Sequence, residues 1–298
     1  MTYHESVLLN QSVDGLDISP NGIYVDVTFG GGGHSKEILK KINQGKLFAF
    51  DQDEDALQNA FNDDRFILIN ANFRYIKNFL RYYKIDAVDG IIADLGVSSF
   101  QIDNPERGFS TRFNSDLDLR MDKRSQLTAR DILSKYKEED LTRIFFEYGE
   151  LKQSKRIART IVSARNINEI KTVDELKNMT ASFAERGKEN KFYAQLFQSL
   201  RIEINSEIDV LKDLLLQSLQ VLKSKGRLVI ISYHSLEDRI VKNFMKYGNF
   251  EGTVEKDFYG NELSPFNVIT RKPIVPDERE TDINKRARSA KLRIAEKK

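Results

Sequence analysis

The chain has 298 residues, of which 40% are hydrophobic and 31% are charged, and this composition predicts a folded, soluble protein of one or two domains. Its formal net charge of +2 is too small for the whole surface to bind a polyanion, so any affinity for nucleic acid must come from local patches. The absence of cysteine excludes disulfides, thiolate metal sites, cysteine nucleophiles and cysteine-held iron–sulfur clusters.

The chain begins with MTYHESVLLNQSVDGL, which lacks the basic segment, the apolar run and the cleavage site of a signal peptide. It also contains no run of about 18 apolar residues, the length that a transmembrane helix needs. We therefore expect a cytoplasmic protein without membrane partners.

The first third of the chain alternates short β-rich runs with helical patterns. The residues predict strands at 23–27, 47–50, 66–69 and 90–93, and helices at 34–42, 54–61 and 75–83. Such an alternation is typical of a parallel sheet whose faces are covered by helices.

Four glycines, Gly30 to Gly33, connect the first of these strands to the first helix. Glycines allow the backbone to approach a ligand closely, and the free N–H groups of the following helix can donate to that ligand. A flexible surface loop is the alternative, but such a loop would not need four consecutive glycines. The third glycine of the dinucleotide fingerprint is missing, because Ser35 or Lys36 stands in its place, and this disfavours NAD.

Three acidic residues stand at predicted strand ends near this turn. Asp51 ends the second strand about 20 residues after the glycines, the position from which a carboxylate accepts hydrogen bonds from ribose hydroxyls. Asp26 and Asp94 stand at the ends of the first and fourth strands, where they would repel a pyrophosphate and attract the ammonium and sulfonium cations of S-adenosylmethionine. Each residue alone could be a turn or cap residue, but together they predict S-adenosylmethionine as the cofactor.

Residues from about 104 to 201 contain helical patterns and no convincing strand, which predicts an inserted helical domain at 104–203. Within it, the segment KQSKRIART places Lys152, Arg156 and Arg159 on one helical face. These cations either meet RNA phosphates or form an ordinary solvated face.

The sheet pattern resumes after the insertion. A long helix at 206–222, with Lys225 and Gly226 as its basic end and its cap, leads into a fifth strand at 227–235. Two more strands, at 265–270 and 289–296, are expected to form a hairpin. The expected fold is therefore α/β, with a doubly wound, seven-stranded, mostly parallel sheet built from residues 1–103 and 204–298.

The last predicted strand lies in a basic tail, which is either a solvated terminal strand or a patch that binds RNA. Its cations are Lys285, Arg286, Arg288, Lys291, Arg293, Lys297 and Lys298.

Ten segments spread over the chain match one known pattern. They are HESVLL (4–9), TFGGGGHS (28–35), DLGVSSFQID (94–103), RGFS (107–110), LRMD (119–122), FFEYGE (145–150), KRIARTIV (155–162), FQSLRIEIN (197–205), IISYHSLEDRIVK (230–242) and RARSAKLR (286–293). Through these segments the sequence resembles the MraW family, the ribosomal RNA small subunit methyltransferases H, nearly from end to end.

This resemblance implies a Rossmann-like, S-adenosylmethionine-dependent methyltransferase with an inserted all-helical domain. It also implies that the enzyme methylates N4 of a cytidine in the decoding region of 16S rRNA. Matched by motif, the cofactor-binding residues would be Gly32, Gly33 and His34 in the glycine turn, Asp51 at the ribose, Phe73 against the adenine, and Asp94 and Gln101. Ordinary alternatives exist for three of them: a first-turn helix residue at His34, a core aromatic at Phe73 and a polar loop residue at Gln101.

The absence of cysteine also bears on the reaction. Methylation at cytosine C5 normally needs a cysteine thiolate, whereas an exocyclic amine can attack the methyl group directly. The lone pair of that amine is delocalised, so an acceptor should hold its N–H bonds and orient the nitrogen. Asp94, or the main-chain carbonyl beside it, is the candidate acceptor, and Asp94 is the candidate catalytic residue. His234 follows the fifth strand and could act as a base or contact the target, but it is interpreted as a hydrogen-bonded strand-end histidine and is given no role. No clustered set of ligands requires a metal.

Several functions remain open at this point. The favoured one is methylation of N4, with 16S rRNA in the small ribosomal subunit as the partner and with the target base splayed out of the folded RNA. A methyltransferase for another RNA position or for a protein is the first alternative. A non-catalytic RNA-binding ribosome assembly factor that retains a cofactor pocket is the second.

Overall fold

The computed structural model describes residues 6–260 and 262–298, and the chain forms two compact units. One unit contains Met1–Gly96 and Asp209–Lys298, and the other contains Val97–Ile208. The sequence placed the insertion at 104–203 instead. The structure differs because the short helix α4 (Ser99–Asp103) belongs to the second unit and because α9 (Glu189–Asn205) continues past residue 203. Of the segment HESVLL, His4 and Glu5 lie outside the described residues.

The first unit contains a seven-stranded sheet. Its strands are β1 (Ile23–Asp26), β2 (Lys46–Phe50), β3 (Phe66–Ile69), β4 (Val88–Asp94), β5 (Leu222–Ser232), β6 (Phe266–Val268) and β7 (Lys291–Lys297). They are arranged in the order β3-β2-β1-β4-β5-β7-β6, with β1 to β5 parallel and β7 antiparallel to both of its neighbours. This topology confirms the predicted doubly wound, mostly parallel fold.

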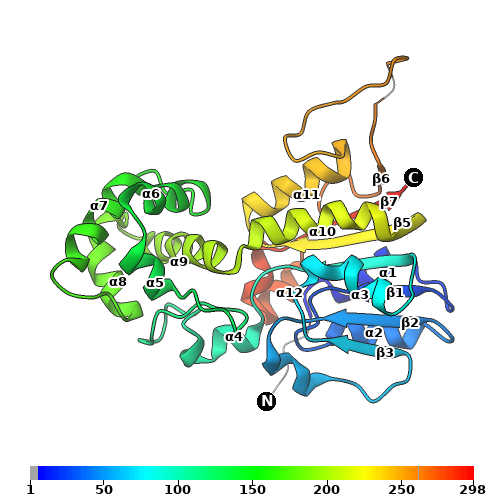
Figure 1. The fold of residues 1–298 in the computed structure, drawn as a ribbon, viewed down its shortest axis with the longest axis horizontal. Helices are drawn as coiled ribbons and strands as arrows, with labels where there is room; N and C mark the ends of the chain where they lie inside the picture. Colours follow the sequence, from blue (N-terminus) through cyan, green and yellow to red (C-terminus); the bar gives the residue numbers. More distant parts are fainter. Residues whose placement is uncertain (1–5, 261) are drawn as a thin grey trace. The chain divides into compact units, whose positions relative to one another are not determined.

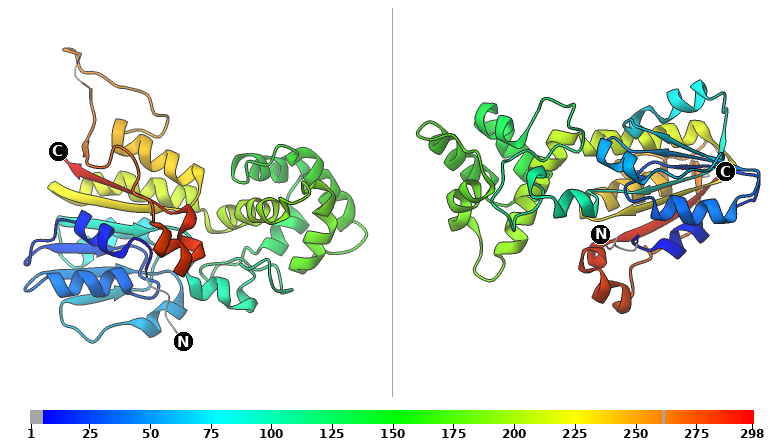
Figure 2. Two further views of the ribbon diagram at one scale, coloured as in Figure 1. Left: turned by 180° about the vertical axis from the view of Figure 1, so that it is seen from behind. Right: turned by 90° about the horizontal axis from the view of Figure 1, so that it is seen from below.

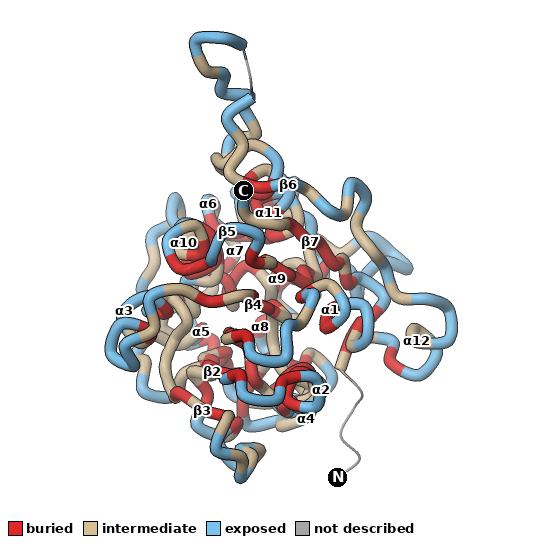
Figure 3. The backbone as a smooth tube through the Cα atoms, turned by 90° about the vertical axis from the view of Figure 1, so that its right-hand side faces the viewer, coloured by how far each residue is buried: buried red, intermediate tan, exposed pale blue. Residues whose placement is uncertain are grey.

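Helices cover both faces of this sheet (Figures 1 and 2). The helices α1 (Leu9–Gly15) and α2 (Gly33–Lys41) lie on one face, and α3 (Ile76–Tyr82), α10 (Glu207–Val221) and α11 (Ser235–Tyr247) lie on the other. The central strands β1, β2 and β4 are therefore buried along most of their length, in the interior of this unit (Figure 3). Two shorter helices, α12 (Glu278–Ile283) and η5 (Lys285–Ser289), precede β7.

Two elements of this unit differ from the prediction. The helix predicted at 54–61 is instead a shorter 3-10 helix, η1 (Glu54–Asn59), whose first turn is capped by the Asp53 side chain. The helix α10 ends at Val221, and the predicted cap at Lys225 and Gly226 lies instead in a bulge of β5. Leu222 pairs with Val88 and Arg227 with Gly90, so residues 223–226 leave the ladder.

The predicted hairpin of the last two strands also takes another form. Strands β6 and β7 do pair antiparallel, but residues 269–290, with α12 and η5 among them, connect the two strands in place of a tight turn. The basic tail is therefore divided: Lys291, Arg293 and Lys297 lie in β7 of the sheet, whereas Lys285, Arg286 and Arg288 lie in η5. Several of its cations have partners within the chain: Arg293 Nε donates to Asp238 at 2.6 Å, and Lys297 Nζ donates to the carbonyl of Leu219 at 2.6 Å.

The second unit is helical throughout its regular elements, as the sequence predicted. Its longer helices are α5 (Ala129–Lys135), α6 (Glu138–Glu147), α7 (Ser154–Arg165), α8 (Val173–Thr180) and α9, with the short elements α4, η3 (Pro105–Arg107) and η4 (Ala181–Phe183). Fully buried residues such as Ile144, Phe145 and Ile161 form its own core. In the part of the chain that the structure describes, no helix is long and apolar enough to cross a membrane.

Candidate active site

The glycine turn leads from β1 into α2, as predicted, and its glycines are needed for two different reasons. A Cβ at Gly32 would lie 2.7 Å from the Phe61 ring, and one at Gly33 would lie 2.0 Å from Ser6 Oγ, so both positions are filled by the chain itself. Gly30 shares with Gly32 a positive φ, which favours glycine, but the nearest atom to a Cβ at Gly30 would be 4.0 Å away. Open space for a ligand therefore lies beside Gly30.

Asp51 lies against this turn. It directly follows β2, and its Oδ2 accepts the Gly30 N–H at 2.8 Å while its Oδ1 accepts the Asp53 N–H at 2.8 Å. Burial raises the pKa of the Asp51 carboxyl to about 6, and the two N–H groups oppose that rise. Each carboxylate oxygen keeps a second lone pair, with which it can accept a hydrogen bond from a ligand hydroxyl.

Asp94 ends β4 and is held from two sides. Its backbone N–H donates to Thr28 Oγ1 at 2.6 Å, and its Oδ1 accepts a hydrogen bond from Tyr233 Oη at 2.7 Å. The side chain is 23% exposed, so part of the carboxylate faces out of the fold. Burial raises the pKa of Asp94 to about 6, although the His34 ring and the Tyr233 hydroxyl lower it.

The two histidines named from the sequence have structural partners. His34 is 4% exposed, its Nε2 lies 3.1 Å from the carbonyl of Val7, and its Nδ1 lies 4.0 Å from Asp94 Oδ2. Burial lowers the pKa of His34, so the ring is neutral at pH 7 and donates from Nε2 to that carbonyl. His234 is the N-cap of α11, and its side chain accepts the Glu237 N–H.

Asp26 differs from the expectation that it lines the crevice. It is only 1% exposed, and its carboxylate accepts hydrogen bonds from Ser35 Oγ at 2.7 Å and from the Thr28 N–H at 3.1 Å. Burial raises the pKa of Asp26 to about 6. Asp26 therefore holds the first turn of α2 through a buried hydrogen bond to Ser35. Asp51 and Asp94 are the two carboxylates of this group that remain accessible at the site.

Phe73 and Gln101 complete the set of predicted residues. Phe73 opens η2 (Phe73–Tyr75) shortly after β3, at the sheet edge that also carries Asp51, and it is half-buried. Gln101 belongs to α4 in the second unit, where its Oε1 accepts the Ser98 N–H at 3.0 Å and its N–H donates to Ser98 Oγ. Contacts of these two residues with a cofactor stay predictions.

Sequence reasoning missed Tyr233, the first residue after β5. The signal was present in the segment IISYHS, because a polar side chain directly after a strand that neighbours β4 must lie near the end of β4. Only His234, the next residue, was named from the sequence. In the structure the Tyr233 hydroxyl donates to Asp94, and His234 is the N-cap of α11.

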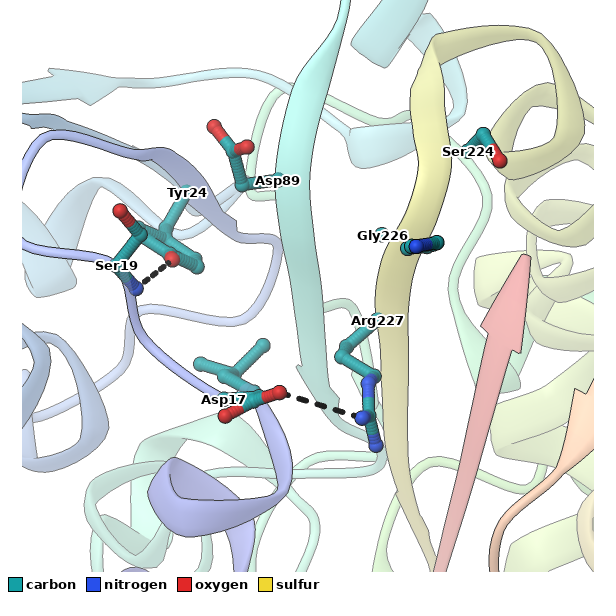
Figure 4. A pocket seen from close by; sticks show the side chains of 9 residues that line it. Asp17, Ser19, Tyr24, Asp89, Ser224, Gly226 and Arg227 are labelled. Atoms are coloured by element: carbon teal, nitrogen blue, oxygen red, sulfur yellow. Dashed lines mark hydrogen bonds and ion pairs between the residues drawn. The ribbon is translucent and has the colours of Figure 1, made fainter. Parts of the chain in front are cut away.

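A small pocket at the opposite edge of the sheet is a separate feature (Figure 4). It has a volume of about 130 Å³ and lies where β4 begins, beside Asp89 and the bulge of β5. Several of its polar groups are paired with one another, for example Arg227 with Asp17 at 3.3 Å and the Ser19 N–H with Tyr24 Oη at 2.7 Å. Within the described residues, no three His, Asp or Glu side chains are grouped to hold a metal ion.

Comparison with known proteins gives consistent matches over the whole chain. Residues 1–298 match the model of the MraW methylase family. The ribosomal RNA small subunit methyltransferase H of Flavobacterium johnsoniae is 61% identical over 298 residues, which is 100% of this chain and 98% of that protein. The protein of the same name from Flavobacterium psychrophilum is 60% identical over 292 residues, 98% of this chain and 100% of that protein. The one from Bacteroides thetaiotaomicron is 55% identical, with coverage of 100% and 98%.

Proposed function

This chain belongs to the MraW methylase family, and we infer that it transfers the methyl group of S-adenosylmethionine to 16S rRNA, the RNA of the small ribosomal subunit. We propose further that the methyl group goes to N4 of a cytidine in the decoding region and that the assembled small subunit is the partner. The proposed substrate places the enzyme in the cytoplasm. Asp94 at the end of β4, in a chain without cysteine, is the observation that carries the choice of an exocyclic amine.

The site suits a cationic donor that carries a ribose. Asp51 and Asp94 bring negative charge to the edge of the sheet, and Gly30 leaves open space between the strand ends. The ribose hydroxyls would donate to Asp51, and Phe73 would lie against the adenine. The ring of His34 is buried, so Gly33 and His34 would act through the backbone N–H groups of the first turn of α2, which can bind a carboxylate. Gly32 would contribute main chain to the pocket, and a cofactor contact of Gln101 in the second unit stays a proposal that rests on the family resemblance alone.

When bound, the donor supplies a methyl group on a positively charged sulfur: the amine lone pair forms the C–N bond while the C–S bond breaks and its electron pair stays on the sulfur. Asp94 accepts a hydrogen bond from the amine before transfer, which directs the nitrogen lone pair toward the methyl carbon. After transfer, the carboxylate takes the proton that the nitrogen releases. A pKa of about 6 leaves Asp94 ionised at neutral pH and therefore ready for both steps.

The test of the proposed function is the identity of the product. The protein is incubated with donor labelled in the methyl group and with small-subunit RNA, either naked or in assembled subunits, and the digested nucleosides are separated. We expect the label in N4-methylcytidine. Label in another nucleoside or in protein would contradict the N4 assignment, and RNA binding without any label would favour the assembly factor.

Donor affinity should depend on pH through the same carboxyl groups. Asp51 and Asp94 both have a pKa raised to about 6, so they lose their charge as the pH falls through this value. We expect the donor to bind at least about tenfold more weakly at about pH 5 than at about pH 7.5, because each carboxyl with a pKa of about 6 is roughly one-tenth ionised at the lower pH. Calorimetric titration over this range measures the effect. The raised pKa values stabilise the fold as the pH falls, so unfolding through these groups would not explain weaker binding.

Asp51→Ala should weaken donor binding by about 2 kcal/mol, because a charge-assisted hydrogen bond to the ribose is lost. The same change also removes the hydrogen bond that Asp51 accepts from the Gly30 N–H, and this loss could loosen the glycine turn. Asn59→Ala is the matched control for that loosening. Asn59 Nδ2 donates to the Gly30 carbonyl at 2.9 Å, and its loss loosens the turn without removing a carboxylate. Calorimetry that finds equal losses for both variants would assign Asp51 to the turn alone.

A further inference from the structure

The hydrogen bond between Tyr233 and Asp94 joins the ends of two neighbouring strands at the proposed site of methyl transfer. Tyr233 Oη lies 2.7 Å from Asp94 Oδ1, and the Tyr233 hydroxyl has a single proton to donate. We infer that Tyr233 is a positioning residue for methyl transfer: it holds Oδ1 of Asp94, so that Oδ2 and its lone pairs face the target amine. This inference rests on the role proposed above for Asp94.

Tyr233 is itself held in place by its surroundings. Its backbone N–H donates to Glu237 Oε2 at 2.9 Å, and Glu237 is a 3% exposed residue in the first turn of α11. The ring also lies beside Gly96, where a Cβ would be 3.7 Å from Tyr233 Cδ2 and where φ is 98°. The Leu95 N–H donates to the Ile231 carbonyl at 3.0 Å and fixes the two strand ends in register. The tyrosine is therefore oriented before any ligand arrives.

The charges around the pair define its chemistry. Burial raises the pKa of Tyr233 well above 10, and Asp94, Glu237 and Glu280 raise it further, so the hydroxyl keeps its proton at every working pH. Burial also raises the pKa of Asp94, with smaller contributions from Asp26 and Glu237, while His34 and the Tyr233 hydroxyl lower it. Loss of the hydroxyl should therefore raise the pKa of Asp94 further. A residue that only filled space would leave this pKa unchanged.

Tyr233→Phe tests the inference, because it keeps the ring and removes the hydroxyl. We expect the single-turnover methylation rate at saturating donor and RNA to fall about tenfold at neutral pH, as a positioned hydrogen bond is lost. The acid limb of the plot of rate against pH should move by about one unit toward higher pH. Donor affinity measured at about pH 8, where Asp94 is ionised in both proteins, should change less than about threefold.

Tyr24→Phe is the matched control. Its hydroxyl accepts the Ser19 N–H at 2.7 Å at the other edge of the sheet, so the acid limb should stay where it is. A rate profile for Tyr233→Phe with an unmoved acid limb overturns the inference. Asp94→Asn in the same assay separates the two proposals. If Asp94→Asn methylates slowly and Tyr233→Phe methylates at the wild-type rate, the positioning role of Tyr233 is wrong and the catalytic role of Asp94 stands. If Asp94→Asn methylates at the wild-type rate, the catalytic role of Asp94 itself is wrong.

Discussion

Asp94→Asn is expected to lower the single-turnover methylation rate about a hundredfold at saturating donor, the range seen when one positioned catalytic group is removed. An asparagine has one acceptor oxygen, and the Tyr233 hydroxyl, which must donate, would keep that oxygen at the position of Oδ1. The amide NH₂ would then face the target amine, and two groups that both donate N–H bonds cannot form a hydrogen bond with each other through those bonds. Donor affinity should fall less, because only one of the nearby negative charges is lost.

Rapid-quench measurements with labelled donor, together with calorimetry, test this result. Asp89→Asn is the matched control, since Asp89 stands near the other end of β4 and its carboxylate accepts the Ile23 N–H at 2.8 Å. That variant loses the same charge at the opposite edge and should methylate at the wild-type rate. If Asp94→Asn binds donor more weakly yet methylates normally at saturation, Asp94 is a donor ligand and has no part in the chemistry.

The sequence was sufficient to predict the side chains that gather at one edge of the sheet. Asp51 directly follows the apolar run LFAF and Asp94 the run IIA, and the carboxyl ends of parallel strands meet at the same edge. The glycine turn was recognisable because four glycines stand between a predicted strand and a predicted helix. These predictions needed the local pattern and the rule for parallel strands, and no knowledge of which strands are neighbours.

Other features depended on pairing across long stretches of sequence. Tyr233 reaches Asp94 because β5 lies beside β4, although the whole helical unit separates these strands along the chain. The bulge at residues 223–226 depends on the register between the same two strands, so Lys225 and Gly226 could be mistaken for a helix end. Asp26 ends a strand that lies between β2 and β4, and its buried carboxylate is bound by Ser35 across the glycine turn. Patterns within one strand carry no information on such contacts.

Within the glycine turn, packing and ligand access can be separated by two substitutions. Gly32→Ala should lower the free energy of unfolding by about 2–4 kcal/mol, since it adds overpacking to the strain of a left-handed residue. The new methyl would lie 2.7 Å from the Phe61 ring and 2.9 Å from the Phe29 ring at a φ of 77°. Denaturant unfolding without donor measures this loss.

Gly30→Ala is the matched control, because it has the same left-handed strain at a φ of 51° but its nearest neighbour would be 4.0 Å away. It should cost about 1 kcal/mol of stability, from the strain alone. The open space beside Gly30 is the space assigned to the donor, so this variant should bind the donor more weakly even though it folds nearly as well as the wild type. Equal losses of stability in the two variants would show that Phe29 and Phe61 yield to the added methyl, and unchanged donor affinity for Gly30→Ala would place the donor away from this turn.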